Sequence, residues 1–271
     1  MKIFEIWDQE NRLSVGTLLY YEKSRTFVIE LAEYLDEWNA PLLLTAYVRR
    51  GVFTIPRDVS FMWVRERIIP SGRQNINMIL RNHGLREYDE LTFLEKSGGR
   101  CSQDSLCIRK CEVLPEYVER RQGRNLKDCT LCAGKTLLCF FQDGTTKKVD
   151  LNTYTGSEEY EKNAIQKILE NEALFASGKI TAGGYAVTFN DSLDLSASAL
   201  YANGVTVPLG LDDFLSFVRN NMLDTSRACD VLLCSRQNLA YLVGKGELTP
   251  VREEVKGNLY LKGDVLAVSS E

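Results

Sequence analysis

The cysteines are the residues of this chain most able to bind a metal. Eight are present, and residues 112–128 separate two close pairs, a spacing that a zinc ribbon can use. The pairs are Cys107 with Cys111 and Cys129 with Cys132. However, the second pair lacks a glycine-rich turn, and Leu131 with residues 137–141 indicates a buried strand. Free cysteine packs as a small apolar side chain in a reducing compartment. We therefore favour buried thiols over zinc and expect no cofactor.

Side chains for acid–base or nucleophilic catalysis do not form a convincing set. The carboxylates Asp143 and Asp191 suit turns, and Asp150 and Asp194 suit caps of the segments that follow them. Ser–His and Cys–His schemes need a histidine, and the only one, His83, falls at the end of an expected helix. The glycine pairs lack the strand–glycine–helix context of a nucleotide site. We therefore expect that the protein is not an enzyme.

Composition is ordinary for a globular protein. The 271 residues are 44% hydrophobic and 26% charged, with a net charge of −4. No apolar run reaches the length of a membrane span, and the N-terminal MKIFEIWDQENR lacks the plan of a signal peptide. We therefore expect a cytoplasmic protein with no membrane partner.

The N-terminal block, residues 1–112, mixes strand and helix patterns. Clusters of β-branched and aromatic residues predict strands over Lys2–Trp7, Val15–Tyr21, Thr26–Glu30, Leu42–Val48, Val52–Ile55 and Phe61–Val64. Helical spacing follows over Arg73–His83 and Tyr88–Lys96. Residues 41–100 also carry ten basic against six acidic groups. These arginines indicate either a solvated face or a second nucleic-acid surface. They are Arg49, Arg50, Arg57, Arg65, Arg67, Arg73, Arg81 and Arg86.

The middle block, residues 113–208, predicts a β-hairpin and a following helix. Asp143-Gly144 suits the tight turn between strands Thr136–Phe141 and Thr145–Leu151, and Ser157–Leu169 has helical spacing. The segments FFQDGTTKKVDL, NEALF, AVTFNDSLDL and ALY resemble a small α+β bacterial family, domain of unknown function 2442. Phe189 stands where that family has tryptophan. The resemblance implies a fold and assigns no chemistry.

The C-terminal block, residues 209–271, predicts two short helices in close succession. Leu211–Arg219 forms a leading helix. Thr225 or Ser226 can cap a helix, and Ser235 can cap the next one, Arg236–Val243. So short a connection makes the two helices cross steeply, as in a helix-turn-helix. Strands over Leu248–Glu253 and Leu259–Leu261, joined by a turn at Lys256–Asn258, then predict a β-hairpin wing.

This order resembles the winged helix-turn-helix of the excisionase and MerR-like DNA-binding families. The matching segments are CSRQNLAYLV, GKGELTPV and LYLKGDVL. The resemblance implies that the second helix enters the major groove of double-stranded DNA. Arg236, Gln237, Asn238 and Tyr241 would face bases or phosphates, with Ser235 as the cap. The residues implied at phosphates or at the wing tip are Arg227, Lys245, Arg252, Lys256 and Asn258.

The charge of this C-terminal block is unfavourable for DNA binding. Residues 207–271 carry seven Lys/Arg against nine Asp/Glu. Affinity for DNA comes largely from phosphates that basic side chains neutralise, so an acidic module has little non-specific affinity for DNA. A module this short normally needs a dimer or a second contact surface to bind tightly, so a homodimer is one expectation.

The sequence therefore predicts an α+β protein built from two small α+β domains followed by a winged helix-turn-helix. The expected function is that of a sequence-specific DNA-binding protein, a bacterial transcriptional regulator. Three alternatives remain open: a scaffold protein whose winged module binds protein, an enzyme activity located in the N-terminal block, and an accessory factor of site-specific recombination.

Overall fold

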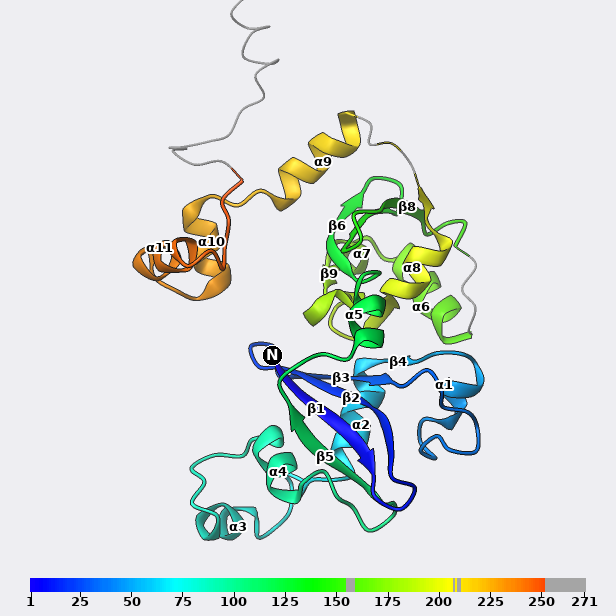
Figure 1. Cartoon of the computed structure of the whole chain (residues 1–271). Coiled ribbons are helices and arrows are strands. Elements are labelled where there is room, and N and C mark those ends of the chain that lie inside the picture. The colour runs from blue at the N-terminus through cyan, green and yellow to red at the C-terminus, as the bar shows by residue number, and fades with distance from the viewer. Residues whose placement is uncertain (155–158, 207, 209–210, 252–271) are drawn as a thin grey trace, which may run out of the picture. The chain divides into compact units, whose positions relative to one another are not determined.

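The computed structural model describes residues 1–154, 159–206, 208 and 211–251 (Figure 1). The chain divides into two compact units, Met1–Pro208 and Leu209–Glu271. The described residues form a mixed α+β fold with three antiparallel sheets. None of the helices in this part of the chain is both long and apolar enough to cross a lipid bilayer.

The first sheet of unit 1 has the strand order β4-β3-β2-β1-β5, and each neighbouring pair is antiparallel. Buried side chains such as Ile6, Leu18 and Ile29 form its core with Trp63 of the helix that covers it. The strands are β1 Lys2–Asp8, β2 Leu13–Tyr21, β3 Thr26–Leu31, β4 Thr54–Ile55 and β5 Leu106–Cys111. The helices of this region are α1 Thr45–Arg49, α2 Arg57–Arg65, α3 Ile76–Asn82 and α4 Glu90–Ser97.

Two strands expected from the sequence are wrong. Residues Phe61–Val64 lie in α2, where Ser60, Trp63, Val64 and the following Arg67 are buried. Their spacing of three and four residues is that of one helix face, so burial follows a helical period. Ser60 also fixes α2 on the sheet, because its Oγ accepts a hydrogen bond from the amide of Ile29 at 3.0 Å.

The other wrong strand is Leu42–Val48. Here the chain turns at Pro41, whose carbonyl accepts the amide of Leu44 at 2.8 Å. Helix α1 follows at once and buries Val48, while Leu44 one turn earlier is also buried. The apolar residues of this segment therefore serve a short helix rather than a strand.

A second core in unit 1 is formed by side chains of two smaller sheets and of helices that pack on them. The strand orders of these sheets are β12-β8-β7-β6 and β11-β10-β9. The hairpin β7–β8 forms as expected around Asp143-Gly144, with Gly144 at φ +84°. The strands are β6 Leu126–Cys132, β7 Thr136–Phe141, β8 Thr146–Asp150, β9 Lys179–Ile180, β10 Ala186–Phe189, β11 Leu193–Ser196 and β12 Val205–Thr206. The helices of this region are α6 Glu159–Glu170, α7 Glu172–Ala176, the 3-10 turn η1 Ala182–Gly184 and α8 Ala197–Asn203. Helix α5 Glu116–Gln122 instead packs its buried Val118 against Leu19 and Val28 of the first sheet.

Polar contacts join distant segments of unit 1, and one of them connects its two cores. Arg57 at the start of α2 donates two hydrogen bonds to the carboxylate of Asp194 in β11, at 2.7 and 2.9 Å. Asp194 therefore contacts another element and does not cap the segment that follows it, which is a correction to the expected role. Arg121 of α5 reaches the buried Glu30 of β3 at 2.8 Å. These contacts connect residues far apart in the sequence.

Candidate nucleic-acid interface

Unit 2 contains α9 Leu211–Asn221, α10 Thr225–Leu232 and α11 Arg236–Gly244. We call α10, the residues Leu233–Ser235 and α11 the helical pair. Its two helices contact each other and are separated by three residues. The described part of unit 2 thus places the expected recognition segment on a helix.

Each helix of the helical pair begins with a side-chain cap. Ser235 caps α11 as expected, because its Oγ accepts the amide of Asn238 at 3.2 Å. The cap of α10 is Asp224, whose carboxylate accepts the amide of Arg227 at 2.8 Å. The expected caps Thr225 and Ser226 are therefore wrong, since these residues already lie within the first turn of the helix. Either cap satisfies an amide that has no partner inside its helix.

The turn between the helices is closed by backbone hydrogen bonds. Leu233 takes the left-handed conformation, with φ 52° and ψ 42°. Its amide bonds the carbonyl of Asp230 at 3.3 Å, and the amide of Cys234 bonds the carbonyl of Cys229 at 3.1 Å. This pair of bonds is the Schellman arrangement that ends many helices, normally with glycine at the left-handed position. It turns the chain directly into the cap of α11.

Helix α11 has one buried side and one exposed side. Leu239 is buried, and Leu242 and Val243 are partly buried. Arg236, Gln237, Asn238, Ala240 and Tyr241 are exposed, and Tyr241 retains 57% of its accessible surface. The residues that the sequence assigns to base contact therefore lie at the surface of the helix.

Lys245 follows α11 and lies against it. Its Nζ is 4.7 Å from the centre of the Tyr241 ring and 3.7 Å from the carboxylate of Glu247. Arg227 is exposed on α10. Both cations are thus at the surface of the helical pair, Arg227 before α11 in the chain and Lys245 directly after it. Arg252, Lys256 and Asn258 lie outside the described residues.

The wing is not shown. Leu248–Val251, the described part of the first expected strand, form no strand. The remainder of that strand, the turn and the second strand fall on residues 252–271, outside the described part of the chain. Of the expected interface, the structure therefore describes the helical pair.

The charges of the described residues 211–251 remain slightly acidic, with four Lys/Arg and five Asp/Glu. Helix α11 itself carries Arg236 and no acidic residue, whereas Asp224 and Asp230 belong to the cap and body of α10. Two causes raise the pKa of Cys229: desolvation of its thiol is the larger, and the interaction with the neighbouring Cys234 is the smaller. Cys229 is therefore a neutral thiol near pH 7 and adds no charge to the turn.

The cysteines considered for zinc do not come together. Cys107 and Cys111 lie on β5 of the first sheet, whereas Cys129 and Cys132 lie on β6 of another sheet. Among the described residues, no group of three or more Cys, His, Asp or Glu side chains could hold a metal ion. The nearest partner of Cys129 is instead Cys139 on the neighbouring strand, with the two sulfurs 3.9 Å apart. This contact with Cys139, together with burial, raises the pKa of Cys129 well above its usual value.

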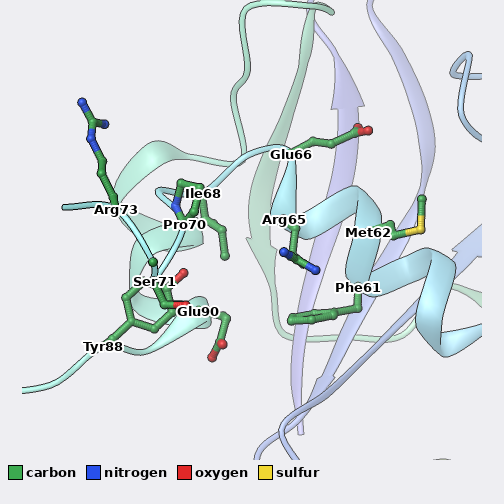
Figure 2. A pocket seen from close by; sticks show the side chains of 11 residues that line it. Phe61, Met62, Arg65, Glu66, Ile68, Pro70, Ser71, Arg73, Tyr88 and Glu90 are labelled. Atoms are coloured by element: carbon green, nitrogen blue, oxygen red, sulfur yellow. The ribbon is translucent and has the colours of Figure 1, made fainter. Parts of the chain in front are cut away.

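Unit 1 offers a second candidate, a hollow of about 900 Å³ beside α2 and the loop that follows it. Figure 2 shows Arg65 directed between Phe61 on one side and Ile68 with Pro70 on the other. Two arginines and two glutamates contribute to the lining, and His83 does not. The hollow therefore combines apolar side chains, such as Phe61 and Ile68, with the cationic Arg65. The lining residues are Phe61, Met62, Arg65, Glu66, Ile68, Pro70, Ser71, Gly72, Arg73, Tyr88 and Glu90.

The glycine pair Gly183-Gly184 has a packing role that the sequence did not reveal. Both residues have positive φ, and a Cβ on Gly184 would lie 2.0 Å from the carbonyl oxygen of Leu126. A Cβ on Gly183 would meet the hydroxyl of Tyr21. This close approach of η1 to β6 explains the pair without a ligand.

Comparisons of the chain with known proteins assign it to no family. No family model matches the chain, and searches of the curated proteins and of the solved structures returned no match. The two resemblances described from the sequence accordingly stay predictions.

Proposed function

We propose that the protein binds double-stranded DNA through the exposed side of α11 and acts as a transcriptional regulator. The observation that carries the proposal is the division of α11 into a buried side anchored by Leu239 and an exposed side with Arg236, Gln237 and Tyr241. A short capped helix held by a preceding helix is the form in which helix-turn-helix proteins present side chains to the major groove.

The chemistry of the exposed side supports this function. Arginine pairs with the O6 and N7 acceptors of guanine, and asparagine or glutamine pairs with adenine. Arg236, Gln237 and Asn238 supply these groups in the first turn of α11, the part of a recognition helix that contacts base edges. The Tyr241 hydroxyl, one turn later, is suited to a phosphate.

Binding to another protein is the second candidate, and the acidic balance of residues 211–251 favours it. The two functions differ in their dependence on salt. DNA binding weakens steeply as salt rises, because each neutralised phosphate releases counterions. Contact through a partner's apolar surface has no such dependence.

The test compares two double variants of the full chain on a labelled duplex recovered by selection with the purified protein. Arg236→Ala with Tyr241→Ala removes the exposed arginine and tyrosine of α11. Arg100→Ala with Tyr34→Ala removes exposed residues of the same types from unit 1 and serves as the control. We expect fluorescence anisotropy to show at least about a fivefold loss of affinity for the first variant, given about 1–3 kcal/mol for a good base contact, and none for the control. Equal affinities would reject α11 as the recognition helix.

A further inference from the structure

A stretch of unit 1 without acidic residues surrounds α3 and is rich in arginine. Residues 67–86, RIIPSGRQNINMILRNHGLR, contain four arginines and no aspartate or glutamate. Helix α3 buries Leu80 and exposes Asn77, Met78 and Arg81. We define the basic surface by its exposed cations and amides, which are Arg73, Gln74, Asn77, Arg81, Asn82 and Arg86.

The structure separates these arginines from the others of residues 41–100. Several of the others have partners within the chain: Arg49 lies 3.3 Å from Glu37, Arg57 binds Asp194, and Arg67 is buried against Asp104. In contrast, Arg73, Arg81 and Arg86 are exposed, and no ion pair is formed by any of them within the described part of the chain. Figure 2 shows the Arg73 side chain extending away from the hollow. Their charges are therefore available to an external anion.

The remaining side chains of the basic surface suit the same kind of anion. Asn77 and Arg81 are four residues apart within α3, so they share one side of that helix, and the exposed Gln74 precedes it in the chain. Their amide and guanidinium N–H groups donate hydrogen bonds, as phosphate oxygens require. Acidic groups return only at Glu87, beyond the last arginine.

We infer that the basic surface is a second DNA-contacting site, which binds the phosphate backbone of the duplex. This inference rests on the proposed function. Unit 2 lacks a surplus of cations, so the phosphate contacts that supply most non-specific affinity must come from elsewhere in the chain. The basic surface supplies them without reading sequence, because phosphate contacts carry no base information.

The dimensions of the basic surface fit this partner. A seven-residue helix is about 10 Å long, and its flanking arginines extend the surface further. Duplex DNA carries one negative charge for about every 1.7 Å of its axis. Several phosphates therefore fall within the span of Arg73, Arg81 and Arg86.

The test uses a fluorescein-labelled 30-base-pair duplex of arbitrary sequence, because non-specific binding depends on phosphate contacts. One variant of the full chain combines Arg73→Gln, Arg81→Gln and Arg86→Gln. The matched control combines Lys23→Gln, Lys162→Gln and Lys167→Gln, which removes the same charge from other exposed positions. Tryptophan fluorescence during thermal unfolding checks that both remain folded.

We expect the slope of log affinity against log salt to become shallower by about 2.7 for the arginine variant, from about 0.9 for each lost phosphate contact. The lysine control should keep the wild-type slope. Equal slopes for the arginine variant and the wild type would overturn the inference, as would an equal change in the control.

The same titrations separate this inference from the proposed function. If the arginine variant is impaired while Arg236→Ala with Tyr241→Ala binds the selected duplex normally, the basic surface stands and the role of α11 fails. If the α11 variant is impaired and the arginine variant keeps its slope, the role of α11 stands and the basic surface is excluded. Failure of the wild-type protein to bind either duplex would overturn both.

Discussion

Removal of Arg121 is predicted to destabilise unit 1 because it leaves a buried carboxylate without its cation. The Glu30 side chain has no exposed surface, and its Oε2 lies 2.8 Å from Nη1 of Arg121 and accepts the Thr54 hydroxyl at 2.8 Å. Burial raises the pKa of Glu30, and the hydrogen bond from Thr54 and the charge of Arg121 offset this only in part. The carboxylate therefore depends on Arg121 for its charge to be tolerated.

At pH 7 the change Arg121→Met should cost about 3–5 kcal/mol, the range for breaking a buried ion pair by removing one partner. For a unit of this size, about 2–4 °C of melting temperature is lost for each kcal/mol. The melting temperature should fall by at least about 6 °C. Glu30→Gln should cost much less, because the neutral amide still accepts from Thr54 and Arg121. Added to Arg121→Met, it should restore part of the loss.

Tryptophan fluorescence reports this unit alone, because all three tryptophans, Trp7, Trp38 and Trp63, lie in it. The control is Arg120→Met on the same helix. Arg120 is 60% exposed and pairs with the exposed Glu33, so solvent screens this pair and its loss should cost much less than the loss of Arg121. A loss of stability for Arg121→Met no larger than that for Arg120→Met would refute the assignment of Arg121. A double variant less stable than Arg121→Met alone would also refute it.

Acidification provides an independent check on the same residue. A carboxyl whose folded pKa is raised stabilises the fold below its unfolded pKa, and this contribution is lost as pH rises through the folded pKa. Because Arg121→Met raises the pKa of Glu30 further, the variant's deficit should shrink as pH falls. A deficit that is constant with pH would show that the loss comes from packing alone.

Two further predictions concern unit 1. Gly184→Ala should prevent correct packing of η1 on β6, because its Cβ would lie 2.0 Å from the oxygen of Leu126. Gly144→Ala, with open space around it, should cost only about 1–2 kcal/mol for its left-handed backbone. Similar melting temperatures for the two variants would contradict this. Burial acts to raise the pKa of Asp8, but hydrogen bonds from Ser105, Asn11 and nearby amides outweigh it and hold the pKa below the ordinary 3.8. Its stabilising contribution is present above 3.8 and lost as pH falls through the folded pKa. Asp8→Asn should therefore lower the melting temperature at pH 7 and approach the wild type in acid; an unchanged difference would contradict the assignment.

Local signals made much of the fold predictable from the sequence. The hairpin β7–β8 was predicted because Asp143-Gly144 specifies a tight turn, and α4 because Gly98 ends it in the left-handed conformation. Ser235 was identified as a cap because its hydroxyl precedes the apolar positions of α11. These features depend on a few neighbouring residues, so the sequence is sufficient to identify them.

Features that depend on distant partners were missed. The run Phe61–Val64 is continuous in hydrophobicity, and only its packing on β3 distinguishes a helix from a strand. Strand β5 was not predicted, because its pairing partner is β1, about a hundred residues away. Leu233 in the left-handed conformation was also unexpected, since a leucine rarely takes the place of glycine there.

The sequence predicted the helices of the candidate site, but not the cap of α10 or the partners of the arginines in residues 41–100. Asp224 rather than Thr225 caps α10, a shift of one residue among three adjacent capping types. The sequence presented the arginines of residues 41–100 as one group. Only the structure distinguishes those engaged with Glu37, Asp194 and Asp104 from those of the basic surface. Ion pairing between distant segments is not encoded in local spacing.

Selection of duplexes from a random-sequence library by the purified full chain tests the central claim most directly. If α11 enters the major groove, the wild-type protein should enrich a recurring short motif, and Arg236→Ala with Tyr241→Ala should abolish that enrichment while the Arg100 and Tyr34 control retains it. Recovery of no motif by the wild-type protein, or of the same motif by the α11 variant, would contradict the account.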